Sequence, residues 1–142
     1  MSWVQLYWAR DKTIPMKNDV QNIEPRPLTR REVGWIREIL QTSEVWKDTD
    51  IGGTEVIAEG PCDEGISIIL RGPEPANTRS SAAEDYIGRL VICTDDNSMI
   101  EVRLTQADRR LHELFVLFVD PKHPRRKFPE SWTEVSHEAS EL

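Results

Sequence analysis

The segment from residue 88 to residue 119 constrains the fold more than any other part of the chain. Ile100, Val102 and Leu104 alternate with charged residues, which is typical of a strand with one buried face and one solvated face. The run Leu114–Val119 is apolar throughout and predicts a central strand that is covered on at least one face. Together with residues 89–93, these segments predict an antiparallel meander, whose apolar face must be sealed by another layer.

The layer that seals this face is predicted to begin after residue 28. The Thr29 hydroxyl can cap the first turn of a helix, and Glu32 can reach back to the free amide of Thr29. Val33 and Ile36 then recur with two later aliphatic residues on one helical face. The sequence therefore predicts an amphipathic helix from about residue 30 to residue 41.

Two more strands are predicted between this helix and the meander. Residues 56–59 alternate, and residues 65–70 are rich in β-branched side chains. Residues 72–87 contain prolines, glycine and a polar stretch, which predict a long loop that is either disordered or functional. The predicted fold is α+β, with one main helix on one face of an antiparallel sheet of four or five strands.

The length of 142 residues fits one domain. Prolines in the polar stretch up to residue 27 predict that residues 1–27 form an N-terminal arm and linker. Residues 28–129 then form the α+β domain. Residues 130–142 contain four glutamates and no lysine or arginine, so we expect an acidic, flexible tail there.

The charge distribution bears on possible partners. The formal net charge is −7, and the four glutamates of the expected tail supply more than half of it. The rest of the chain is nearly balanced and lacks a net basic face, so we expect no binding to nucleic acid. No stretch approaches the length needed to cross a bilayer, and the first positive charge follows the apolar N-terminal residues, which is unlike a signal peptide. Cys62 and Cys93 define no disulfide framework, so we expect a cytoplasmic location.

No motif in the sequence predicts catalysis or metal binding. Asp95, Asp96 and Asn97 supply oxygen ligands but lack the spacing of a calcium loop, and they predict a hairpin turn. The histidines lack metal-ligand spacing, and the chain has neither a nucleophile elbow nor a glycine-rich phosphate loop. We therefore predict no catalytic residue, no metal ion and no cofactor.

Two groups of residues remain as candidates for binding a ligand or partner. Acidic residues fall at the predicted strand ends, and tryptophans fall near the N-terminus. Tryptophan is favoured in binding surfaces, although it also fixes terminal arms to a small core. The candidate residues are Asp63, Glu64, Glu113, Asp120, Trp3 and Trp8.

Three short motifs resemble a family of small uncharacterised bacterial α+β proteins. The motifs are Arg26-Pro27-Leu28-Thr29 with Glu32, then Asp63-Glu64-Gly65-Ile66-Ser67, and Leu111-His112-Glu113-Leu114 with Val119-Asp120. The resemblance covers about residues 25–130. It implies an α+β fold and no established activity. Some small bacterial proteins of this general kind act as immunity or partner-binding proteins, which is an analogy at the level of the fold.

Three hypotheses for function follow. The first is a non-catalytic, cytoplasmic protein-binding module, of which neutralisation of a toxin is one form. The second is a small enzyme or ligand-binding domain, in which Asp63, Glu113 and Asp120 converge at one end of the sheet beside Arg71 or Arg103. The third is self-association through an edge strand or the N-terminal tryptophans.

Overall fold

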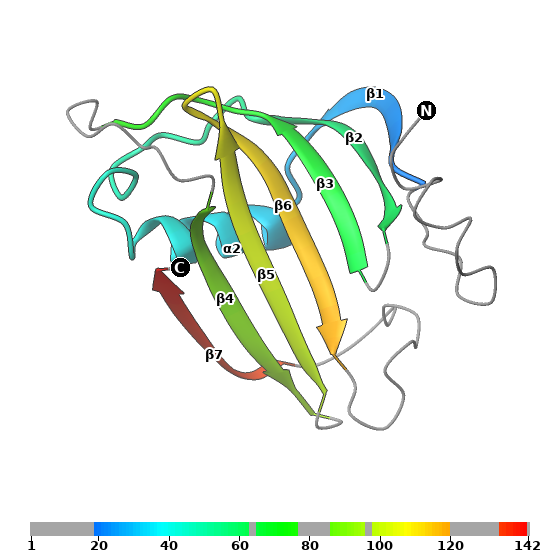
Figure 1. Cartoon of the computed structure of the whole chain (residues 1–142). Helices are drawn as coiled ribbons and strands as arrows, with labels where there is room; N and C mark the ends of the chain where they lie inside the picture. The colour runs from blue at the N-terminus through cyan, green and yellow to red at the C-terminus, as the bar shows by residue number, and fades with distance from the viewer. Residues whose placement is uncertain (1–18, 63–64, 77–85, 96–97, 120–133, 142) are drawn as a thin grey trace, which may run out of the picture.

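The computed structural model of the chain describes residues 19–62, 65–76, 86–95, 98–119 and 134–141. These residues form one helix and seven strands (Figure 1). The elements are β1 (Gln21–Pro27), α2 (Arg30–Leu40), β2 (Glu55–Cys62), β3 (Gly65–Arg71), β4 (Tyr86–Thr94), β5 (Met99–Ala107), β6 (Arg110–Val119) and β7 (Glu134–Glu141).

All seven strands belong to one antiparallel sheet, in the order β1-β2-β3-β6-β5-β4-β7. The predicted α+β class and the meander from β4 to β6 are confirmed, and β6 lies in the middle of the sheet. The predicted number of four or five strands is wrong, because the sheet has seven. The strands that the sequence did not predict are the two at its edges.

Each edge strand lacks the pattern by which strands are usually recognised. β1 lies in the expected linker and contains Pro25 and Pro27, and prolines are tolerated in edge strands. β7 lies in the expected acidic tail, and its sequence EVSHEASE shows no apolar alternation. It is nevertheless paired along its length with β4, with Ala139 opposite Leu90. Pairing with an existing sheet, rather than amphipathic periodicity, accounts for both strands.

Helix α2 begins as the sequence predicts. The Thr29 hydroxyl accepts a hydrogen bond from the Glu32 amide at 3.1 Å, and the Thr29 amide donates to the Glu32 carboxylate at 2.8 Å. Ile36 and Ile39 are fully buried, and burial of such side chains contributes about 1.5–3 kcal/mol each. The helix packs over β4, β5 and β7, and at Gly88 of β4 an added Cβ would come within 3.0 Å of the Ile39 side chain.

The core lies between α2 and the face of the sheet that it covers. Leu114, Val116 and Phe118 of β6 point into this core, next to inward residues of β4 and β5. The segment between α2 and β2 contributes Trp46 and Ile51, which extend the core toward β2 and β3. One helix and one loop therefore seal one face of the whole sheet.

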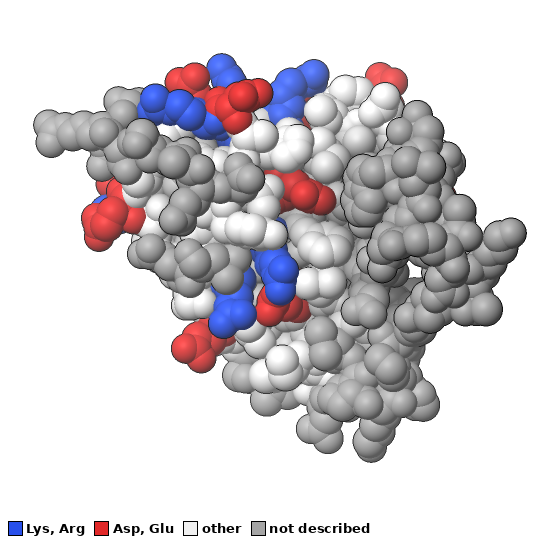
Figure 2. Space-filling model, in the orientation of Figure 1, with Lys and Arg blue, Asp and Glu red and all other residues white. Residues whose placement is uncertain are grey.

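The opposite face of the sheet is turned toward the viewer in Figures 1 and 2. Phe115 and Leu117 are half-buried there, and Glu101 is paired with Arg89 and Arg103 across β4 and β5. In the described part of this face, basic and acidic side chains are interspersed (Figure 2). This face is therefore neither predominantly acidic nor predominantly basic in its described part.

Candidate functional site

A hollow of about 400 Å³ lies between α2 and the edge strand β7. We call it the α2–β7 groove. Trp35 and Leu90 contribute apolar surface to it, and both side chains are buried, at 8% and 2% exposure. The residues that line it are Arg31, Gly34, Trp35, Glu38, Leu90, Glu134 and His137.

Gly34 leaves space open beside the groove. A Cβ atom at this position would meet no atom within 4 Å, so packing does not require a glycine here. A glycine inside a helix is nonetheless less favourable than alanine by about 1 kcal/mol. Because glycine has no side chain, the backbone in the middle of α2 borders the groove directly.

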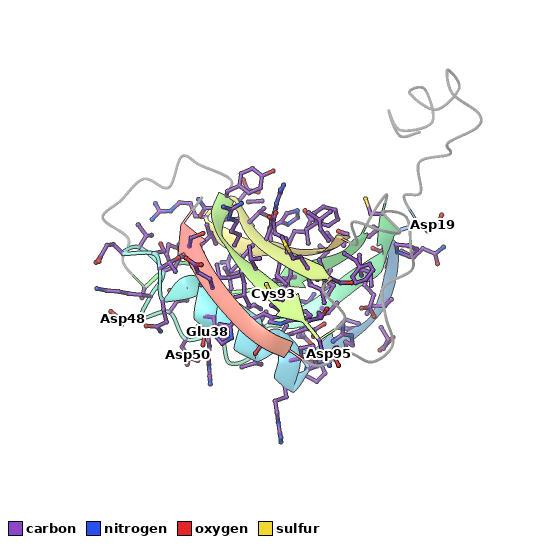
Figure 3. The ribbon with its side chains drawn as sticks, turned by 90° about the horizontal axis from the view of Figure 1, so that it is seen from below. Asp19, Glu38, Asp48, Asp50, Cys93 and Asp95 are labelled. Carbon is purple, nitrogen blue, oxygen red and sulfur yellow. The ribbon has the colours of Figure 1, made fainter. Side chains whose placement is uncertain are left out.

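Charged groups from both elements meet around His137. Its Nδ1 atom lies 3.2 Å from the Glu134 carboxylate, and its Nε2 atom lies 3.8 Å from the carboxylate of Glu38. Figure 3 shows Glu38 on α2 beside β7. Both carboxylates remain in contact with solvent, with side-chain exposures of 52% for Glu38 and 41% for Glu134. Their charges can therefore act on a molecule that enters the groove.

A cation already lies near the aromatic side chain of this groove. The Arg31 guanidinium carbon is 6.0 Å from the centroid of the Trp35 ring. A guanidinium at this distance is attracted by the negative face of the ring. The groove thus combines an aromatic ring, which attracts cations, with two exposed carboxylates.

The backbone edge of β7 borders the same groove. β7 pairs with β4 on one side, and within the described ranges no strand pairs with its other side. A row of unpaired amides and carbonyls on an edge strand can accept a further strand. The groove and the strand edge together form a continuous candidate binding surface.

A second cluster of charged residues lies where β1, β2 and α2 meet. The Arg26 guanidinium donates to both carboxylate oxygens of Glu32, at 2.9 and 3.0 Å, and to Glu59 at 2.9 Å. Burial opposes the charge on Glu32, but hydrogen bonds from Arg26 and the Thr29 amide outweigh it and lower the pKa of this carboxyl. These side chains satisfy one another, so we assign the cluster a structural role.

Of the six candidate residues from the sequence, only Glu113 is among the described residues. It lies in β6, on the face of the sheet opposite α2, and its carboxylate accepts a hydrogen bond from the Ser67 hydroxyl. Asp63, Glu64, Asp120, Trp3 and Trp8 lie outside the described residues. The predicted convergence of Asp63 and Asp120 on Glu113 therefore stays a prediction.

The two arginines expected near Glu113 are bonded elsewhere. Arg71 donates to Glu55 at 2.5 Å, and Arg103 donates to Glu101. Each guanidinium therefore already has a carboxylate partner other than Glu113. Across the described residues, no group of three or more histidine, cysteine, aspartate or glutamate side chains is arranged to hold a metal ion.

The α2–β7 groove was not predicted from the sequence, although the residues that α2 contributes to it leave a signal there. Arg31, Trp35 and Glu38 recur at helical spacing beside the apolar stripe, and Gly34 interrupts the helix surface among them. The residues that β7 contributes leave no such signal, because Glu134 and His137 lie in a polar segment that was expected to be a tail. Only the pairing of β7 with β4 brings them next to α2.

Comparisons with protein-family models, with characterised proteins and with solved structures find no match to this chain. The resemblance drawn from the three short motifs therefore stays a prediction. The described helix is too short and too polar to cross a membrane. What the fold defines is the class: an α+β domain with one helix packed on a seven-stranded antiparallel sheet.

Proposed function

We propose that this chain is a non-catalytic protein-binding module whose partner docks along the α2–β7 groove and the edge of β7. The observation that carries the proposal is a strand edge with which no described strand pairs, next to a hollow that has an apolar side and charged side chains of both signs at its rim. Neutralisation of a toxin is one activity that such a module can perform. That role and the cytoplasmic location both stay predictions.

The size of the surface favours a protein partner over a small molecule. The hollow of about 400 Å³ has the volume of a small-molecule site, but it is open, whereas small-molecule sites enclose most of the ligand's surface. β7 extends it by eight residues, which is a length of about 27 Å. A stable protein interface buries about 800 Å² on each partner, so a protein that uses this surface must contact both the groove and the strand.

Tryptophan, arginine and buried aliphatic side chains support the same assignment. Tryptophan and arginine are enriched among residues that dominate binding energy, and such residues lie in partly enclosed pockets. Trp35, Arg31 and Leu90 provide this combination in the α2–β7 groove. Charged groups at the rim, such as Glu38 and Glu134, contribute to the choice of partner and to the rate of association.

Substitutions at Gly34 test the proposal without disturbing the core. Gly34→Gln places a neutral side chain in the groove, and Gly34→Ala adds only a methyl group. We expect a partner isolated from the source organism to bind wild type and Gly34→Ala equally in calorimetry with purified proteins. We expect Gly34→Gln to weaken binding at least tenfold while its thermal unfolding temperature is no lower than that of wild type.

Two results would count against the proposal. One is a partner that binds Gly34→Gln as tightly as wild type. The other is a partner whose contact surface, mapped by chemical-shift changes, lies on the face of the sheet that carries Phe115 and Leu117. Either result would place the interface outside the α2–β7 groove.

A further inference from the structure

The backbone of β7 is suited to pairing with another strand. Alternate residues of an antiparallel strand direct their amides and carbonyls to opposite sides, so half of these groups in β7 point away from β4. β7 contains no proline across its eight residues. The other edge strand, β1, contains Pro25 and Pro27, which have no amide hydrogen to donate, so it is the poorer template; each edge strand has one register shift with its neighbour.

The two faces of β7 both carry negative charge. Glu134 lines the α2–β7 groove. Glu138 is exposed and pairs with Val91, whose neighbour Leu90 points into the core, so Glu138 lies on the face opposite the groove. The register shift between Glu134 and Ser136 places Glu134 and Glu138 on opposite faces although they are four positions apart. β7 contains three glutamates and no lysine or arginine. A strand laid beside it therefore meets carboxylates on either face.

We infer that the partner contributes a basic, extended segment that adds to the free edge of β7 as a further strand. This inference depends on the proposed function and specifies the chemistry of the partner. Opposite charges on neighbouring strands stabilise their pairing, and like charges destabilise it. A second copy of this chain would place the glutamates of one β7 against those of the other, so the charge pattern disfavours a homodimer through this edge.

The α2–β7 groove accommodates one basic side chain of such a segment. The aliphatic stem of a lysine or arginine packs on Leu90 and Trp35, and its charged end lies near Glu38 and Glu134. Arg31 already lies 6.0 Å from the Trp35 ring centroid, so the added charge is attracted by the carboxylates of Glu38 and Glu134 and not by this ring. The groove therefore accepts the charge that the β7 edge selects.

Synthetic peptides test both the charge and the strand pairing. The probe is an eight-residue peptide, Lys-Lys-Thr-Thr-Lys-Lys-Thr-Thr, which presents lysine on both faces of a strand. It is titrated into the full chain and followed by amide chemical shifts. The matched peptides replace lysine with glutamate, or carry N-methyl groups on alternate amides along one edge or along the other. N-methylation removes a donor without changing the charge, so it separates strand pairing from simple electrostatic attraction.

We expect saturable binding of the lysine peptide, with shifts concentrated in β7 and α2, and no binding of the glutamate peptide. One N-methylated set should weaken binding at least tenfold and the other less than threefold, because only one edge of the peptide pairs with β7. The double variant Glu134→Gln, Glu138→Gln should weaken binding about tenfold, which corresponds to the loss of two cross-strand ion pairs. Glu24→Gln on β1 is the matched control and should change nothing.

Failure of this inference differs from failure of the proposed function. If the lysine peptide does not bind, or if both N-methylated sets bind equally well, strand addition by a basic segment is wrong. The proposed function survives that result if Gly34→Gln still abolishes binding of the natural partner. If Gly34→Gln leaves that partner bound, the proposed function itself is wrong.

Discussion

The two edges of the sheet are built in opposite ways. At the β1 edge, Arg26 joins the strand to Glu32 at the start of α2 and to Glu59 of β2, and prolines interrupt the strand. At the β7 edge, a continuous strand borders an open groove, and the contact with α2 passes through His137 and Glu38 at 3.8 Å. One edge is closed by partly buried ion pairs, whereas the other leaves the carboxylates of Glu38 and Glu134 in contact with solvent and has no strand paired to its outer side among the described residues.

This difference separates stability from binding. Removing one member of a set of buried, mutually bonded charges is costly, because its partners stay behind unpaired. Exposed charges contribute little to stability, which leaves them available for a partner. Substitutions at the β1 edge should therefore change stability, and substitutions at the β7 edge should change binding.

The largest expected effect on stability is that of Arg26→Met. This change retains much of the side-chain volume but leaves Glu32, whose side chain is only 7% exposed, without its cation. We expect a loss of about 3 kcal/mol in the free energy of unfolding, measured with urea at neutral pH. Arg37→Met, at an exposed position of α2, is the control and should cost less than about 0.5 kcal/mol. Equal losses in the free energy of unfolding for the two variants would show that the ion pairs of Arg26 do not stabilise the β1 edge.

A smaller effect with a defined pH dependence is expected for Glu32→Gln. At neutral pH the change should cost about 2 kcal/mol, because it removes the charge from hydrogen bonds with Arg26. The pKa of Glu32 is lowered in the folded protein, so its stabilising contribution is present above the unfolded-state pKa and is lost as the pH falls through the lower folded-state pKa. The difference between wild type and Glu32→Gln in urea unfolding should therefore shrink below about pH 4. A difference that stays constant down to pH 2 would contradict this assignment.

The smallest expected effect is a gain in stability at the open edge. Gly34→Ala fills space that no atom occupies within 4 Å and removes the conformational freedom of glycine in the unfolded chain. We expect a gain of about 0.5–1 kcal/mol in the free energy of unfolding, with binding of the partner unchanged. A loss of stability would mean that the space beside Gly34 is not open. Gly34 would then not line the α2–β7 groove.

The sequence predicted the parts of the fold whose burial leaves a regular pattern. Thr29 and Glu32 marked the start of α2, and the alternation of Ile100, Val102 and Leu104 marked β5, because one face of each element is buried. The edge strands leave no such pattern. β1 contains prolines, and β7 is polar on both faces, so each is specified by its pairing with a neighbour that lies far away in the sequence.

The candidate site was harder to predict than the fold for the same reason. The places of Glu113 and other acidic residues at strand ends in the sequence predict that these residues converge at one end of the sheet. The structure bonds Glu113 to Ser67, whereas the α2–β7 groove joins residues about 100 positions apart, such as Trp35 and His137. Helical spacing could have indicated Arg31, Trp35 and Glu38 as one surface, but no local pattern indicates which strand lies beside it.

Amide hydrogen exchange at both edges of the sheet, with and without the bound partner, tests the central claim most directly. We expect the partner to slow exchange in β7 and in the part of α2 around Gly34, while exchange in β1 is unchanged. The same pattern should appear with Arg26→Met, provided that exchange is measured where this variant is folded. Protection of β1, or of the sheet face that carries Phe115, with β7 unaffected would contradict the assignment of β7 as the binding edge.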